Sequence, residues 1–166
     1  MPTPADASRR KVPCQELLPL VEEAIRGGAT VRIAATGNSM LPFIGHGDAV
    51  ELQPLGRAPL RRGDVVLARV AQGAYVLHRV VKARGTVVTL KGDALSNCDP
   101  PLPADGVVAR AVCAVRGDLA IPLGTAPYRL LALALGRLLP LLPRRFRPGL
   151  RASNLLFRLA GGLRRR

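Results

Sequence analysis

The chain has 166 residues, of which 48% are hydrophobic, and it carries a formal net charge of +14. A chain of this length and composition can bury a core of its own, so we expect one folded domain and exclude a disordered chain. All 11 acidic residues lie between Asp6 and Asp118, whereas the sequence from Leu119 onward has ten Arg and no Asp, Glu or Lys. The positive charge is therefore mostly local, which disfavours nucleic acid as the partner.

The cysteines and the apolar segments indicate the cellular compartment of the protein. Cys14, Cys98 and Cys113 are an odd number without a CxxC pair, so we expect neither a disulfide framework nor a zinc site, and no other cofactor. The basic residues 9–11 are followed by Pro and Glu rather than by the apolar stretch of a signal peptide. The apolar run 130–142 contains an Arg and a Pro and is shorter than the roughly 20 residues of a spanning helix. We therefore expect a cytoplasmic protein, with peripheral attachment to the inner membrane surface as an open alternative.

In chain order, the first expected element is a short amphipathic helix over residues 14–26, ended by Gly27 and Gly28. Its apolar positions recur at helical spacing: Leu17, Leu18, Val21 and Ile25. After this helix the hydrophobic period changes to two, which is typical of β-strands. Six such runs are separated by Gly, Pro or Asp turns: residues 30–34, 49–53, 64–70, 75–83, 86–92 and 107–115. Six strands at short intervals predict an antiparallel or mixed sheet coiled into a small barrel.

From Pro127 the pattern becomes helical again, with Arg set among Leu and with three Pro that divide it into short pieces. The whole pattern predicts a mainly β fold with a short N-terminal helix and a C-terminal helical, Arg-rich extension. We expect three segments: a helical segment over 1–28, a β domain over 29–122 and the Arg- and Leu-rich tail over 123–166. Three interpretations of the tail stay open: helices packed on the domain with Arg outward, an anchor on an anionic membrane surface, and, least favoured, a nucleic-acid patch.

Ser39 is the candidate nucleophile. It lies in the segment Gly37-Asn38-Ser39-Met40-Leu41-Pro42, where Gly and Pro predict a tight turn that exposes a hydroxyl beside backbone N–H groups. A serine attacks only when a base takes its proton and a third group orients that base. His78, in the strand 75–83, is the expected base, because an imidazole with its ordinary pKa of about 6.5 accepts a proton near neutral pH.

Three ordered segments carry a resemblance to a known family. Residues 37–42 resemble the serine box of signal peptidase I and of the related self-cleaving domains of SOS repressors. Residues 62–66 (RGDVV) with 75–81 (YVLHRVV) resemble the Gly-Asp strand and the base-bearing strand, with His as in the endoplasmic-reticulum and archaeal branch. Residues 90–99 (LKGDALSNCD) resemble the acidic box of that branch. The resemblance covers about residues 29–116 and leaves out the tail.

This resemblance implies a peptidase fold and a Ser-His-Asp mechanism. Ser39 is then the nucleophile, His78 the general base and Asp99 the carboxylate that orients the imidazole. The Ser39 backbone N–H and a neighbour hold the oxyanion, and the supporting residues are Gly37, Asn38, Met40 and Asp93. The sequence departs from the family at Gly37, where some bacterial members have a hydroxyl residue, and at Ala94 and Leu95, where the family often has Asn.

Each residue also has a plainer interpretation. Ser39 is alternatively a turn serine, His78 a strand histidine bonded to a carbonyl, and Asp99 the start of a loop before Pro100. Lys82 is the fallback base. Asp93 follows a Gly and is expected to be structural, with a smaller chance of supporting His78.

Other polar residues are expected to be structural. His46 is expected in an exposed turn without a catalytic role. Asp48 and Asp64 each follow a Gly and are expected to form turns. Cys98 is expected to be a small filler, with an accessible thiol as the open alternative.

The leading hypothesis is therefore a serine endopeptidase that cleaves a leader or signal-like peptide bound in extended form. The alternative is a catalytically weak or inactive peptide-binding module of the same fold. A self-cleaving repressor is disfavoured, because only about 28 residues precede the first strand, too few for a helix-turn-helix domain.

Overall fold

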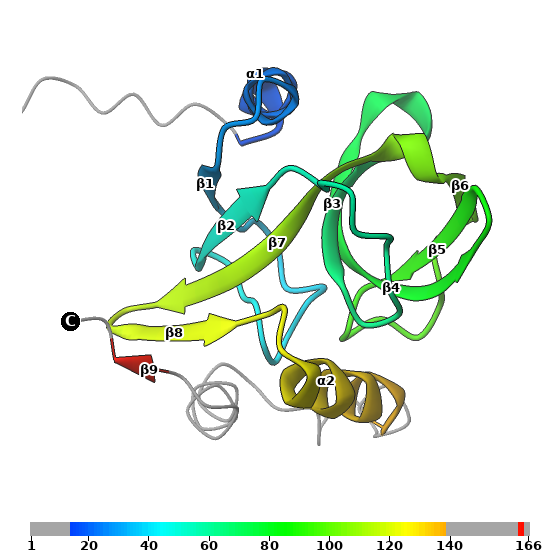
Figure 1. Cartoon of the computed structure of the whole chain (residues 1–166). Helices are drawn as coiled ribbons and strands as arrows, with labels where there is room; N and C mark the ends of the chain where they lie inside the picture. Colours follow the sequence, from blue (N-terminus) through cyan, green and yellow to red (C-terminus); the bar gives the residue numbers. More distant parts are fainter. Residues whose placement is uncertain (1–13, 139–162, 165–166) are drawn as a thin grey trace, which may run out of the picture.

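The computed structural model describes residues 14–138 and 163–164. Within this part, the fold is mainly β, with one antiparallel sheet and a helix toward each end of the chain (Figure 1). The helices are α1 (Cys14–Arg26) and α2 (Ala126–Leu138), and the strands are β1 (Val31–Ala34), β2 (Ala49–Gln53), β3 (Val65–Arg69), β4 (Tyr75–Arg84), β5 (Val87–Lys91), β6 (Leu102–Pro103), β7 (Val107–Arg116), β8 (Leu119–Pro122) and β9 (Leu163–Arg164).

The sheet has the strand order β1-β2-β7-β3-β4-β5-β6, with β8 paired to β7 and β9 paired to β8. Strands β3 to β6 curl around one side while β2, β7 and β8 extend away from them, so that the sheet forms a half-barrel (Figure 1). The six strands predicted from the period-two pattern are all present. The short strands β6, β8 and β9 were not predicted; β6 and β9 have two residues each, too few for a period to stand out.

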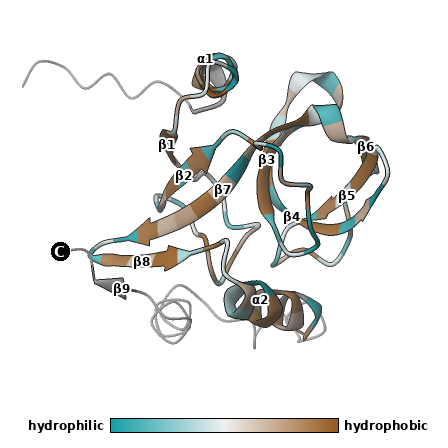
Figure 2. Cartoon of the chain, in the orientation of Figure 1, coloured by the Kyte–Doolittle hydropathy of each residue, from teal (hydrophilic) through white to brown (hydrophobic). Residues whose placement is uncertain are grey.

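Two apolar clusters fill the fold. The larger one lies among β2, β3, β7 and both helices, and the smaller one lies inside the curl of β3 to β6 (Figure 2). The larger cluster includes Leu18, Phe43, Ile44, Val50, Leu52, Leu67, Ala109, Ile121 and Tyr128, and the smaller one Val66, Val80, Val88, Leu90 and Leu102. Alternate residues of β3 enter different clusters, as expected for a strand whose two faces are both covered.

Helix α1 has the predicted bounds and packs through Leu18 and Ile25, which are buried. Leu17, one of the four apolar positions at helical spacing, is 41% exposed. Adjacent helical residues are about 100° apart around the axis, and the buried stripe of α1 is too narrow to include both leucines. On the same helix, Glu22 accepts a hydrogen bond from the Tyr75 hydroxyl of β4, which ties α1 to the sheet.

Helix α2 packs on the domain, which is one of the three interpretations left open for the tail from residue 123. Tyr128 and Ala132 are buried in the larger cluster, and the Tyr128 ring packs edge-on against Phe43. None of the helices in residues 14–138 is long and apolar enough to cross a membrane. The predicted helical pieces at residues 139–162 lie outside the described part, and residues 163–164, expected to be helical, form β9.

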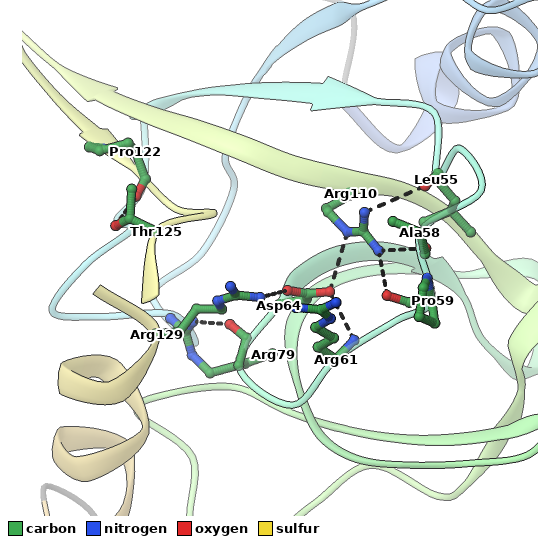
Figure 3. Close-up of polar contacts among 11 residues, drawn as sticks. Leu55, Ala58, Pro59, Arg61, Asp64, Arg79, Arg110, Pro122, Thr125 and Arg129 are labelled. Carbon is green, nitrogen blue, oxygen red and sulfur yellow. Dashed lines mark hydrogen bonds and ion pairs between the residues drawn. The ribbon is translucent and has the colours of Figure 1, made fainter. Parts of the chain in front are cut away.

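Asp64 joins α2 to the sheet through a buried network (Figure 3). Its Oδ1 accepts a hydrogen bond from Arg129 Nη1 of α2 at 3.0 Å, and its Oδ2 accepts one from the Arg61 backbone N–H at 3.0 Å. Arg110 Nε of β7 lies 3.3 Å from Oδ2. The Arg110 guanidinium also donates to the carbonyl groups of residues 55, 58 and 59. The sequence suggested only a turn at Asp64. The structure shows that Asp64 also joins α2 and β7.

Asp48 has a similar place at the other end of β7. It is buried, pairs with Arg116 at 2.6 Å, and accepts a hydrogen bond from the Gly45 backbone N–H at 2.8 Å. Its interpretation as a simple turn residue was incomplete, because its Arg partner is 68 residues away in sequence.

Candidate active site

Ser39 lies on the bend that follows β1. The chain leaves β1 at Ala34 and turns at Gly37, whose φ of +82° is a left-handed conformation that favours glycine. The bend is fastened to the next loop, because Ala35 N–H donates to the Asp48 carbonyl at 2.8 Å. Met40 is buried beneath it in the larger cluster. The sequence therefore places a half-buried Ser39 side chain on a bend supported from below.

His78 faces this bend from β4. It lies opposite Val66 of β3 in the sheet, and only 6% of its surface is exposed. Its Nε2 is 3.1 Å from Ser39 Oγ, and its Nδ1 is 2.6 Å from Asp99 Oδ2. The structure thus brings together the three side chains that the sequence assigned to a triad, although they are 39 and 21 residues apart.

The segment 92–99 positions both ends of this chain of contacts. Ala94 N–H donates to the Ser39 carbonyl at 2.8 Å, and Asp99 N–H donates to the Leu90 carbonyl at 2.9 Å. Gly92 lies so close to the bend that a Cβ there would be 2.7 Å from the Ser39 carbonyl oxygen. The resemblance drew attention to Asp99 in this segment, but the backbone contacts with Ser39 were not foreseen.

The variant Gly92→Ala is therefore expected to displace the Ser39 bend. A Cβ at 2.7 Å from backbone oxygen cannot be accommodated without movement, and Leu95 side-chain atoms at 2.9 and 3.0 Å close the other direction. We expect losses of about 1–3 kcal/mol in the free energy of unfolding, as for other overpacked sites, measured by urea denaturation. Gly124→Ala is the matched control, because a Cβ there meets nothing within 4 Å. Equal stability of both variants would contradict the close approach.

Arg79 is next to His78 in β4 and points to the other face, as successive strand residues do. It is buried and donates to both carboxylate oxygens of Asp93, at 2.8 and 2.7 Å, and to the Gly63 carbonyl at 2.7 Å. Its guanidinium also lies 5.4 Å from the centre of the Tyr128 ring. Asp93 therefore supports the site by holding the strand residue after His78, and the smaller expectation of a direct role on the imidazole is not what the contacts show.

The electrostatics of this pair favour its charged form. Burial works to lower the pKa of Arg79, but the charge of Asp93, the Tyr128 hydroxyl and the hydrogen bonds to both together raise that pKa well above its ordinary value. Burial also raises the pKa of Tyr128 to about 12, against the opposing charge of Arg79. Arg79 thus stays charged and Tyr128 neutral at any pH near neutrality.

A cavity of about 140 Å³ opens beside Ser39 and His78. Its walls are both polar and apolar and come from four elements and the bend; the apolar side chains include Leu18 of α1, Ile33 of β1, Leu67 of β3 and Leu77 of β4. Tyr75 closes one side, where burial and then its hydrogen bond to Glu22 raise the pKa of its hydroxyl. The cavity can take an apolar side chain of a ligand next to the serine hydroxyl.

The remaining residues that the sequence singled out are placed as follows. Gly37 N–H donates to His46 Nδ1 at 3.4 Å, and His46 N–H donates to Asn38 Oδ1 at 3.4 Å, so the exposed His46 joins the two ends of the connection between β1 and β2. Lys82 is exposed on β4, four residues beyond His78, and does not line the cavity. Cys98 is exposed, so its interpretation as a filler is wrong.

The arrangement places a hydroxyl, an imidazole and a carboxylate in one chain of contacts, three of the groups that acyl transfer uses. A hydroxyl is within hydrogen-bond distance of an imidazole, and a carboxylate holds the other ring nitrogen, so the imidazole can accept the serine proton and remain oriented. In the described residues, no cluster of three or more His, Cys, Asp or Glu side chains is arranged to hold a metal ion.

The sequence did not predict the roles of three residues around the site. Gly92 and Arg79 lie inside the segments that carry the resemblance. The role of Gly92 depends on its closeness to Ser39, 53 residues earlier in the chain, and the role of Arg79 depends on its ion pair with Asp93, 14 residues later. Tyr128 lies in α2, outside the resemblance, and only its aromatic character in a Leu-rich helix distinguished it.

Comparison with known proteins adds no family to this geometry. No protein-family model matches the chain, and no curated protein matches it.

Proposed function

We propose that the chain is a serine endopeptidase resembling signal peptidase I, in which Ser39 attacks the peptide carbonyl, His78 takes its proton and Asp99 orients the imidazole. The observation that supports the proposal most is the continuous chain of contacts from Ser39 Oγ to His78 Nε2 at 3.1 Å and from His78 Nδ1 to Asp99 Oδ2 at 2.6 Å. The imidazolium formed in the attack then protonates the leaving amine, and water repeats the sequence on the acyl-enzyme.

The surroundings of Ser39 favour a substrate in extended form. Among the described strands, β1 pairs on one side only, with β2, and Ile33 and Ala34 of β1 line the cavity. A peptide laid along such an edge makes main-chain hydrogen bonds while one of its side chains enters an adjacent pocket. A cavity of about 140 Å³ with several apolar side chains in its wall suits a small or medium apolar side chain, as in leader and signal-like peptides.

A second candidate function is a peptide-binding module of the same fold with little or no turnover. It is favoured by one contact: Gly37 N–H already donates to His46 Nδ1, and therefore does not serve as a free oxyanion donor beside the Ser39 N–H. Loss of one such donor typically costs about 10²–10³ in kcat, so binding without fast cleavage is compatible with the geometry.

A library of extended peptides distinguishes the two functions. We expect the parent chain to cleave a subset of the library, with an apolar residue near the scissile bond, and Ser39→Ala to cleave none of it; mass spectrometry of the products is the measurement. Ser96→Ala is the matched control, because it also replaces a serine by alanine, at an exposed position in the segment 90–99. Peptides retained by both parent and Ser39→Ala without cleavage would establish the binding module, and cleavage by Ser39→Ala would overturn the proposed nucleophile.

A further inference from the structure

The outward face of α2 is apolar, although it lies on the surface of the domain. Leu130, Leu131 and Leu138 are 69%, 41% and 60% exposed, and the helix contains no acidic residue. The opposite face of α2 packs into the core through Tyr128 and Ala132. A surface helix normally turns charged residues to solvent, so a leucine-rich outer face is the kind of patch that marks an interaction site.

A cationic cavity of about 210 Å³ adjoins this face. Arg62, Lys91 and Arg137 line it, together with Leu133 of α2. The only carboxylate in its wall is that of Asp93, whose two oxygens are bound by Arg79. The cavity therefore offers positive charge without a free negative charge.

The apolar face and the cavity form one continuous surface. Leu130, Leu133 and Arg137 have the spacing i, i+3, i+7, which places them along a single stripe of α2. The stripe runs from the exposed leucines to the wall of the cavity. A ligand that covers this surface must therefore be anionic at one part and apolar at another.

We propose that this α2 surface, formed by Leu130, Leu131, Leu138 and the cationic cavity, docks on an anionic phospholipid bilayer. The helix lies in the plane of the interface, its leucines enter the boundary between headgroups and acyl chains, and the cavity receives the phosphate of one headgroup. A second copy of the chain does not fit this surface, because each copy has a net charge of +14 and would bring cation against cation. The proposal is independent of the peptidase activity.

The test measures the partition of the full chain onto phosphatidylcholine vesicles with and without one quarter phosphatidylglycerol. We expect binding to the anionic vesicles, and we expect Arg62→Gln/Arg137→Gln to weaken it by roughly 30-fold, since each basic residue near an anionic surface contributes about fivefold. Arg57→Gln/Arg84→Gln removes the same charge from exposed positions in the β2–β3 loop and at the end of β4, and is the matched control. Equal weakening by the two pairs, or equal binding to both vesicle types, would overturn the proposal.

Two further measurements distinguish a lipid phosphate from a free phosphate in the cavity, and a membrane from a second copy of the chain on the α2 surface. Cys98 lines the cavity and is exposed, so anionic vesicles are expected to slow its alkylation, as mapped by mass spectrometry. Protection by millimolar inorganic phosphate alone, equal to that by vesicles, would assign the cavity to a soluble anion and overturn docking. Leu130→Ser/Leu138→Ser is expected to weaken vesicle binding at unchanged thermal stability, and a parent chain that is dimeric through this face would contradict the proposal.

Discussion

Alanine in place of Ser39 or of His78 is expected to lower kcat on a cleaved peptide by about 10⁴- to 10⁶-fold, and the double variant is expected to lose no more than either single one. The reason is that the hydroxyl and the imidazole, 3.1 Å apart, act in one proton transfer, so that removal of either side chain stops the same step. Single-turnover kinetics on the best peptide from the library measures the three values.

The variant Asp99→Asn tests whether the Asp99 carboxylate contributes to the same step. Its carboxylate holds His78 Nδ1 at 2.6 Å, and the amide would stabilise the wrong ring tautomer, which lowers kcat by about 10⁴-fold in sites of this kind. Asp105→Asn is the matched control, because Asp105 is exposed in the short helical turn Ala104–Gly106. Multiplicative losses in Ser39→Ala/His78→Ala, or a fully active Asp99→Asn, would show that the three residues do not act as a unit.

Asp93→Ala is expected to lower the free energy of unfolding by about 3–5 kcal/mol, as measured by urea denaturation. Asp93 and Arg79 are both buried, and the guanidinium would be left without its carboxylate when Asp93 is removed. A buried unpaired charge is among the most destabilising features that a single substitution produces.

Two further variants isolate the cause of this loss. Asp118→Ala removes an exposed carboxylate and is expected to change stability by less than about 0.5 kcal/mol. Arg79→Met/Asp93→Leu removes both charges and is expected to recover part of the loss, because buried pairs can often be replaced by apolar residues. A double variant less stable than Asp93→Ala would show that Arg79 contributes mainly through Gly63 and Tyr128.

The sequence was sufficient where the signal is local. The period-two runs predicted the longer strands, and the apolar spacing with Gly27 predicted the bounds of α1. Ser39, His78 and Asp99 were identified because each lies in a short segment of specific composition, and because the three segments occur in a particular order. Their distances then come from the sheet, which could not be derived from any one segment.

Interactions between residues far apart in the chain could not be predicted from the sequence. A Gly followed by Asp reads as a turn at Asp48 and Asp64, yet both carboxylates are buried and paired with Arg residues from β7 and α2. The charge asymmetry suggested that the chain divides near residue 123, but Tyr128 attaches α2 to Arg79 of β4, and Arg129 attaches it to Asp64, the residue before β3. Composition does not reveal such pairings, because they depend on which segments the sheet brings side by side.

The most direct test of the proposed nucleophile is covalent labelling with a peptidyl phosphonate ester, which modifies a serine only when a base activates it. Peptide mapping by mass spectrometry is expected to find one adduct, on Ser39, in the parent chain, and none in His78→Ala. An adduct on Ser8, Ser96 or Ser153, or equal labelling of Ser39 without the imidazole, would contradict a serine activated by His78.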